Sequence, residues 1–181
     1  IIYGWPGQEF AELRFDVQTL IKMKIPHLSF YALSMEAKTP FGRLLAKGAI
    51  KENSEQRFLD FYEYISSSLT GDYIHEEVSN WSLPGFTCKH NWLYWQNGYY
   101  LSVGSGACGY LPSATSKIGI RYCYNRSDRL FIKSQPVKED IDFILSNKTK
   151  QKDWLTIEKR DKTLWLYEYI GTSLRTSKGF D

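Results

Sequence analysis

The order strand, helix, strand at the start of the chain limits its fold more than any other feature of the sequence. Ile1 to Gly4 is apolar, and Pro6-Gly7 then favours a turn. Apolar residues recur at helical spacing over about 9–24, which predicts an amphipathic helix. Residues 27–34 (HLSFYALS) indicate a second strand that is apolar on both faces. A helix of this length between two strands predicts a βαβ unit with parallel strands.

The same alternation continues along the first half of the chain. A short helix is expected after Thr39, and Asn53 or Ser54 is placed to cap a longer one. Gly71 ends that helix, and a third strand is expected at about 73–79. The order βαβαβ predicts an α/β fold, as in half of an α/β barrel or in a doubly wound sheet.

The pattern changes after the third strand. The expected segments are irregular chain at 80–89, an aromatic and then glycine-rich stretch at 90–109, a short strand at 119–125, a helix at 138–146, a polar linker at 147–153 and a last helix at about 158–175. We expect this last helix to open a further domain that is cut short. Because an apolar strand begins directly at Ile1, we also expect the chain to start inside a larger sheet.

Composition excludes several classes of protein. Of the 181 residues, 43% are hydrophobic and 24% charged, as in a soluble globular protein. The net charge is +3, and the basic residues form no block, which argues against nucleic-acid binding. Neither a membrane-spanning apolar run nor a secretory signal is present in the sequence, so we expect a cytoplasmic location.

The three cysteines, Cys88, Cys108 and Cys123, are odd in number and widely spaced. This argues against a disulfide framework and for a reducing compartment. Cys88 and His90 are two soft ligands, whereas a closed zinc site usually needs four. The CxxxCxxC run that holds a radical-enzyme iron–sulfur cluster is absent. We therefore predict no metal site within this chain.

Other candidate residues favour structural roles. The glycine cluster at 104–109 lacks the lysine of a phosphate-binding loop, so a tight turn is the favoured interpretation. Glu76 and Glu77 are neighbours on a predicted strand and point to opposite faces, so they cannot act as a catalytic pair. His27 precedes a strand and is expected to be structural. No order of residues typical of a catalytic triad is evident.

Several blocks of the sequence carry a resemblance to a known family. They are Ile2–Gln8 (IYGWPGQ), Leu28–Leu33 with Glu36 and Thr39-Pro40, Glu77–Asn80 (EVSN) with Pro84-Gly85, His90–Trp95 (HNWLYW) with Tyr100–Ala107, and Leu174-Arg175 with Gly179. In this order the chain resembles the radical S-adenosylmethionine (SAM) family of oxygen-independent coproporphyrinogen III oxidases, of HemN/HemW type. The residues of the His90–Trp95 and Tyr100–Ala107 blocks are most similar to the HemW branch of the family, the haem chaperones.

The resemblance implies the C-terminal half of a parallel α/β radical SAM barrel, a partial TIM-type barrel. On this basis residues 1–134 are its later strands and helices, and residues 135–181 start a small C-terminal helical domain. Active sites of such barrels lie at the carboxyl ends of the strands.

The family's binding positions carry over to the following cofactor-binding candidates: Gly4, Gln8, Tyr31, Ala32, Gly106, Ala107 and Cys108. Tyr31 and Ala32 correspond to the strand that contacts SAM near its adenine. The glycine loop is expected to approach the cofactor or substrate through backbone atoms. Cys108 stands where the family usually has histidine, which removes a proton carrier and supplies a possible thiolate.

The function implied is that of a fragment of a radical SAM haem chaperone. Its parent would bind a 4Fe–4S cluster, SAM and haem, and pass haem to a membrane haem protein. Two alternatives stay open: an anaerobic oxidase that decarboxylates coproporphyrinogen III propionates, and a remnant that only binds. Because the cluster cysteines are missing, the chain alone is expected to be inactive.

Overall fold

A computed structural model of the chain describes residues 1–113, 118–127, 129, 132, 144, 153–158 and 160–179. The chain forms two compact units, Ile1–Cys88 and Lys89–Asp181, which we call the N-terminal and C-terminal units. Within the described ranges, no helix has the length and apolar character that a bilayer span requires. The boundary expected at residues 134 and 135 between barrel and C-terminal domain stays a prediction.

In the N-terminal unit, the predicted βαβ arrangement is confirmed. Strand β1 (Ile2–Tyr3) lies parallel to β3 (Tyr31–Ala32), and helix α1 (Phe10–Lys22) lies between them in sequence. The pairing aligns Ile2 with Tyr31 and Tyr3 with Ala32. The carboxyl ends of both strands therefore meet at one edge.

The segment predicted as one strand over 27–34 divides between two sheets. Its first part is β2 (His27–Ser29), and its second part is β3. Phe30, which lies between them, donates its backbone N–H to the Ser79 carbonyl at 2.8 Å. The division arises because the strand pairs with β1 on one side and with a hairpin on the other.

That hairpin corrects the prediction for residues 73–89. Strand β4 (Ile74–Glu77) turns at residues 78–79 into β5 (Asn80–Ser82), and β5 pairs antiparallel with both β4 and β2. The third predicted strand thus has an antiparallel neighbour, and residues 80–82 are not irregular. Burial of Trp81 stabilises this hairpin, because Trp81 is 1% exposed and its strand β5 lies between β2 and β4.

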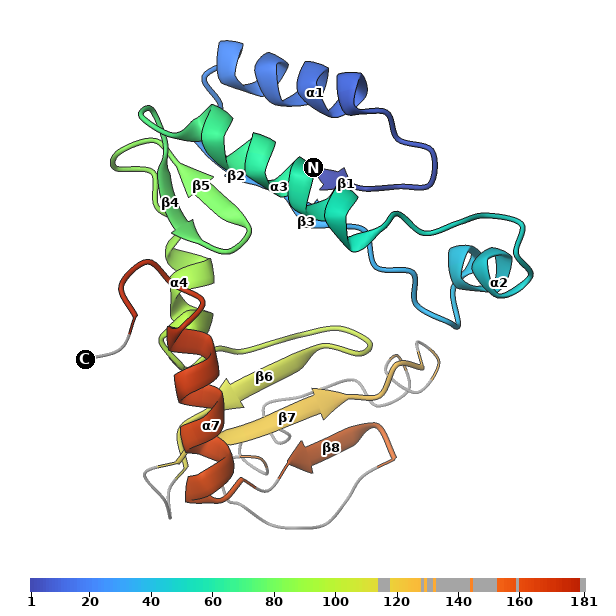
Figure 1. Cartoon of the computed structure of the whole chain (residues 1–181). Helices are drawn as coiled ribbons and strands as arrows, with labels where there is room; N and C mark the ends of the chain where they lie inside the picture. Colours follow the sequence, from blue (N-terminus) through green and yellow to red (C-terminus); the bar gives the residue numbers. More distant parts are fainter. Residues whose placement is uncertain are drawn as a thin grey trace. The chain divides into compact units, whose positions relative to one another are not determined.

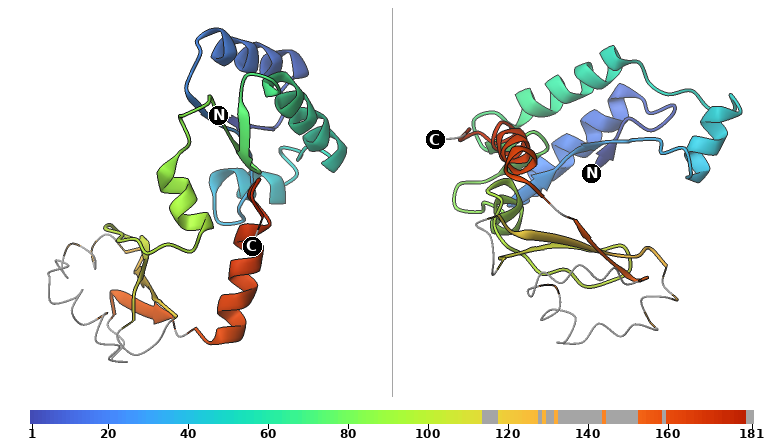
Figure 2. Two further views of the ribbon diagram at one scale, coloured as in Figure 1. Left: turned by 90° about the vertical axis from the view of Figure 1, so that its left-hand side faces the viewer. Right: turned by 90° about the horizontal axis from the view of Figure 1, so that it is seen from below.

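Helices α1 and α3 (Glu55–Leu69) run side by side over these strands (Figures 1 and 2). Ser54 caps α3 as predicted, with its Oγ accepting from the Arg57 N–H at 3.2 Å. The shorter helix α2 (Pro40–Ala46) begins after Thr39, as expected. The core of this unit contains the buried residues Tyr3, Leu13, Val17, Leu28, Phe30, Phe61, Ile65, Leu69, Tyr73 and Trp81.

In its described residues, the C-terminal unit combines the helices α4 (Lys89–Trp95) and α7 (Lys162–Ser173) with a three-stranded antiparallel sheet. The strands of this sheet are β6 (Cys108–Leu111), β7 (Ile120–Tyr124) and β8 (Leu155–Glu158). Strand β7 is the middle strand, and α7 crosses one end of the sheet (Figure 1). The strand expected at 119–125 is confirmed, whereas β8 was not expected. The helix expected at 138–146 lies outside the described residues, apart from Ile144.

A disulfide joins Cys108 to Cys123, which corrects the expectation that the cysteines are unbridged. The two residues face each other directly in the antiparallel pairing of β6 with β7. Side chains at directly opposed positions of such a pair lie close enough to bond. The sequence spacing alone did not reveal this register. Cys88 is a free thiol.

Candidate functional site

The candidate residues of the N-terminal unit gather at one edge of the β1–β3 pair. Gly4 directly follows β1, while Tyr31 and Ala32 form β3. The Gly4 N–H donates to the Gln8 side-chain Oε1 at 2.5 Å. Gly4 has a φ of 81°, a conformation that glycine adopts at little cost. The structure thus brings Gly4, Gln8, Tyr31 and Ala32 together, as the sequence indicated.

Gln8 is the buried polar residue of this edge. It is 0% exposed, and its Nε2 has no hydrogen-bond partner among the described residues. An unpaired buried donor costs about 1–3 kcal/mol, so an acceptor supplied by a ligand would stabilise it. This orphaned donor fits a polar cofactor such as SAM at the carboxyl ends of the strands. The assignment of these four residues to SAM stays a prediction.

The chain does not fit a 4Fe–4S cluster. Clusters of this kind are held by cysteine thiolates. Two of the three cysteines are bonded to each other, which leaves Cys88. In the part of the chain that the structure describes, no group of three or more His, Cys, Asp or Glu residues is placed to hold a metal ion.

Glu76 and Glu77 have separate partners, but a register shift between His75 and Glu77 interrupts the regular alternation on which the prediction of opposite faces rested. Both are nearly buried, at 2% and 3% exposure. The Ser82 Oγ donates to Glu76 at 2.5 Å, and the Asn80 side-chain amide donates to Glu77. These bonds close the β4–β5 hairpin and indicate a structural role.

The glycine loop uses its own N–H groups internally. The Gly106 N–H donates to the Asn125 carbonyl at 3.0 Å, and the Ala107 N–H donates to the Gly104 carbonyl at 3.1 Å. The Cys108 sulfur is bonded to Cys123 and is therefore no thiolate. Cofactor binding by Gly106, Ala107 and Cys108 remains untested, but these atoms are not free to make it in this conformation.

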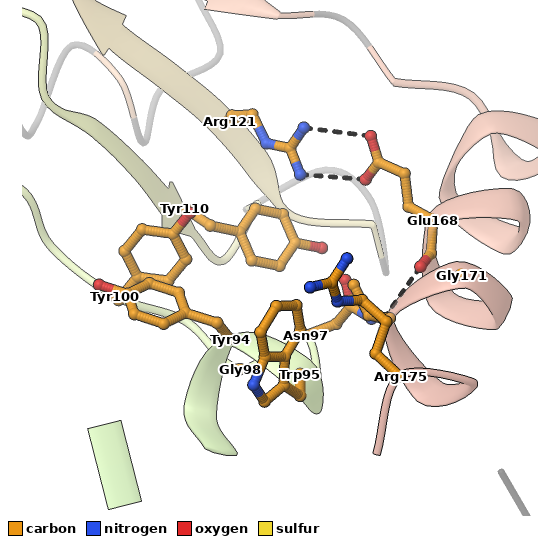
Figure 3. Close-up of a pocket in the computed structure, with 11 residues that line it drawn as sticks. Tyr94, Trp95, Asn97, Gly98, Tyr100, Tyr110, Arg121, Glu168, Gly171 and Arg175 are labelled. Atoms are coloured by element: carbon orange, nitrogen blue, oxygen red, sulfur yellow. Dashed lines mark hydrogen bonds and ion pairs between the residues drawn. The ribbon is translucent and has the colours of Figure 1, made fainter. Parts of the chain in front are cut away.

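A pocket of about 410 Å³ lies within the C-terminal unit. Its wall comes from α4 and the loop after it, from β6 and β7, and from α7 (Figure 3). The lining residues are Tyr94, Trp95, Asn97, Gly98, Tyr100, Tyr110, Arg121, Glu168, Gly171, Thr172 and Arg175. The volume lies within the range of roughly 300–1,000 Å³ that is usual for small-molecule sites.

One side of the pocket is formed by an ion-pair cluster. Arg121 donates two hydrogen bonds to Glu168, at 3.1 and 3.0 Å. Arg160, whose side chain is buried, also forms an ion pair with Glu168, and its guanidinium lies 5.1 Å from the centre of the Tyr110 ring. Burial, and then the nearby charge of Arg121, lower the pKa of Arg160. The Glu168 carboxylate is therefore shared by two cations.

The other side is aromatic. The Tyr94 and Tyr100 rings pack edge to face, with their centres 4.5 Å apart. The Arg175 guanidinium lies 4.8 Å from the centre of the Trp95 ring, in cation–π contact (Figure 3). Burial raises the pKa of the Tyr100 hydroxyl, an effect that the charge of Arg121 partly offsets. The pocket thus combines flat apolar surface with positive charge.

His90 lies one helical turn before Tyr94 on α4, and its side chain is exposed. Its Nε2 lies 2.9 Å from the Tyr94 hydroxyl. The other two histidines lie in the N-terminal unit. The His75 ring stacks on the Trp81 ring, with the ring centres 4.5 Å apart. The His27 Nε2 is buried and has no hydrogen-bond partner among the described residues. His90 is therefore the histidine best placed to bind an external metal complex.

None of the residues that line this pocket was predicted from the sequence as a binding residue. Tyr94, Trp95 and Arg175 fall within the blocks that carry the family resemblance. Arg121 and Glu168 were missed, because 47 residues separate them and nothing local marks either one. The one available signal was the charge of Arg121 within an otherwise apolar and aromatic strand.

Comparisons with known proteins bear on the family and the fold of the chain. No family model matches the chain. The haem chaperone HemW of Lactococcus lactis is 35% identical over 179 residues, covering 98% of this chain and 46% of the relative. HemW of Bacillus subtilis is 28% identical over 160 residues, covering 88% and 42%. The structure of coproporphyrinogen III oxidase HemN from Escherichia coli, a radical SAM enzyme, matches with a TM-score of 0.57 at 14% identity, covering 97% of this chain and 39% of that one.

The match to the Lactococcus lactis relative places the chain in the haem-chaperone family of HemW, and the match to HemN shows that it has the fold of part of a radical SAM enzyme. The resemblance read from the sequence blocks is confirmed, as is the α/β fold class. More particularly, the chain is a homologue of the HemW haem chaperones over nearly its whole length. It spans about half the length of the curated relatives that it matches, at 46% and 42%.

Proposed function

We propose that this chain is the tetrapyrrole-binding part of a haem chaperone, and that His90 supplies an axial ligand to the haem iron. The observation that carries the proposal is the position of an exposed His90 on α4, one turn before Tyr94 in the wall of an aromatic pocket. The similarity to HemW proteins supports haem as the ligand.

The chemistry of α4 suits this role. A neutral imidazole is a common haem ligand, and its second nitrogen is usually held by a hydrogen bond. The contact between His90 Nε2 and the Tyr94 hydroxyl orients the ring. It leaves Nδ1 without a partner among the described residues. Trp95 and Tyr100 line the pocket and give its wall an aromatic, largely apolar character that suits a macrocycle.

The whole parent protein would add the cofactors of its family. SAM would bind at the carboxyl ends of β1 and β3, where Gln8 presents its unpaired amide. The cluster ligands would come from outside this chain, since its own cysteines do not fit. We propose that the parent acts in the cytoplasm and passes haem to a membrane haem protein, as the resemblance implies.

Titration of the full chain with haem tests the proposal. A Soret band that shifts and saturates at one haem per chain is expected for the wild type. His90→Ala should abolish the shift. His75→Gln is the matched control, because His75 stacks on Trp81 in the N-terminal unit and should leave haem binding intact. A shift that survives in His90→Ala overturns the assignment of the ligand, and a wild type without any shift overturns haem binding.

The fold likeness to HemN favours a second candidate, an oxidase of coproporphyrinogen III. The parent protein, with SAM and a reductant under anaerobic conditions, would then release carbon dioxide from porphyrinogen propionates. Haem binding without this reaction supports the chaperone. If the parent protein shows neither haem binding nor decarboxylation, the result supports a non-catalytic remnant that binds some other ligand or only folds.

A further inference from the structure

We propose that the pocket between α4, the sheet and α7 binds a carboxylate side chain of the tetrapyrrole, and that Arg175 is the residue that holds it. The inference rests on the proposed haem-binding function and extends it to a specific contact. The proposal that His90 binds the iron did not use Arg175 or the block Leu174-Arg175 with Gly179 to which it belongs.

The first step is the charge balance of the pocket. Glu168 is the acidic residue of its lining, and both of its oxygens already accept hydrogen bonds from Arg121. The buried Arg160 pairs with the same carboxylate. Arg121 has a second, longer contact with Glu158 at 3.5 Å, which completes two cations with two anions. The positive charge of Arg175 is therefore not compensated by these two carboxylates.

The second step concerns Arg175 itself. Among the described residues its guanidinium has no carboxylate partner, and it lies 4.8 Å from the centre of the Trp95 ring. A guanidinium stacked on an indole keeps its outward N–H groups free, in a planar fork that matches a carboxylate. The ring limits the positions that the guanidinium can adopt and so reduces the ordering cost of binding.

The third step is the shape of the surrounding wall. Trp95, Tyr94 and Tyr100 present aromatic surface, and Arg175 adds one uncompensated cation. A ligand that matches both features is planar, largely apolar and anionic at its edge. A tetrapyrrole that carries propionates has this chemistry. The contact between Tyr94 and His90 joins the pocket to the proposed iron ligand through one helix.

The test compares haem with haem dimethyl ester, which has the same iron and macrocycle but no free carboxylates. The variant is Arg175→Gln. Its control is Lys162→Gln, which removes one positive charge from the first turn of α7, outside the pocket, whereas Arg175 lies just after the end of that helix. Dissociation constants of both ligands are measured by Soret titration for each form of the full chain, and thermal melts confirm that each form is folded.

For the wild type we expect the ester to bind ~10- to 100-fold more weakly than haem, the range for a lost hydrogen bond to a charged group. Arg175→Gln should weaken haem binding by a similar factor and bind the two ligands equally, within about twofold. Lys162→Gln should keep the wild-type preference for haem.

Two outcomes overturn the inference while the proposed function stands. One is a wild type that binds haem and its ester equally. The other is an Arg175→Gln variant that still prefers haem as strongly as the wild type does. By contrast, a wild type that binds neither compound contradicts the proposed function itself, so the two failures are distinguishable.

Discussion

Arg121, on the middle strand of the C-terminal sheet, meets Glu168 on α7 through two parallel hydrogen bonds of 3.1 and 3.0 Å. This fork-to-fork geometry is the most specific that an arginine and a carboxylate can form. It joins a strand to a helix 47 residues further along the chain. The pair also forms one wall of the pocket, so its geometry fixes both the packing of α7 and the shape of the site.

Glu168→Gln should destabilise the chain by about 3 kcal/mol, because removal of one partner leaves buried guanidinium charge without compensation. Arg160 is the main cause, since its side chain is fully buried. Unfolding in urea, followed by circular dichroism, measures the change. Glu158→Gln is the control: its side chain is 43% exposed and 3.5 Å from Arg121, so its loss should cost no more than about 1 kcal/mol. Equal effects of the two variants would contradict the prediction.

Reduction of the Cys108–Cys123 disulfide should lower the free energy of unfolding. The bridge spans 15 residues of sequence, and a loop of that length corresponds to about 3 kcal/mol in the chain-entropy model. Unfolding in denaturant with and without a reductant measures this, and the double variant Cys108→Ala with Cys123→Ala should behave like the reduced wild type. Cys88→Ala should leave the response to reductant unchanged. Coincident unfolding curves for the oxidised and reduced chains would argue that the bridge does not form.

Gly4→Ala should lower the free energy of unfolding more than Gly48→Ala does. Both glycines have positive φ values, 81° and 68°, so both variants bear a conformational cost of about 1 kcal/mol. A methyl group at Gly4 would also collide with the Phe58 ring, whereas nothing lies within 4 Å at Gly48. We expect a further loss of about 1–3 kcal/mol from overpacking at Gly4. Thermal melts that shift equally in the two variants would contradict this.

Alkaline pH should destabilise the chain through its buried tyrosines. Burial raises the pKa of Tyr73 above its ordinary value of 10.0, and the Tyr73 hydroxyl donates to the Ile25 carbonyl at 2.9 Å. The stabilising contribution is complete below the pKa of the unfolded chain. It is lost as pH rises through the higher pKa of the folded chain, because the unfolded state then releases the proton more readily.

Tyr73→Phe tests this contribution. The variant should lose about 1 kcal/mol at neutral pH with the hydrogen bond to Ile25, and its stability should fall less steeply above pH 10 than that of the wild type. Denaturant midpoints measured from neutral to alkaline pH give the comparison. An unchanged slope above pH 10 would show that Tyr73 does not contribute.

Local signals in the sequence were enough to place the main helices of the N-terminal unit. Ser54 marks the start of α3 because its hydroxyl satisfies an unpaired backbone N–H there. The parallel pairing of β1 with β3 also followed from sequence, since a helical crossover of that length returns the chain in the same direction.

Features that depend on pairing between distant segments were not predicted. Residues 80–82 form a strand because Trp81 is buried between β2 and β4. The segment is short and its other two residues are polar, so its sequence does not indicate a strand. The Cys108–Cys123 bridge depends on the register of β6 with β7. Within the candidate site, Trp95 and Arg175 lie in blocks that carry the family resemblance but were not predicted as binding residues, and nothing local marks the Arg121–Glu168 pair.

Strand β7 has an alternating pattern of burial that links the interior of the C-terminal unit to its ligand pocket. Tyr122 and Tyr124 face the core at 1% and 6% exposure, while Arg121 points to the pocket from the opposite face. A slip of one residue in this strand would exchange the two faces. Burial of Tyr122 and Tyr124 therefore fixes the orientation of the Arg121 side chain as well. A substitution that disturbs the packing of these tyrosines should also displace the Arg121 guanidinium from the pocket wall.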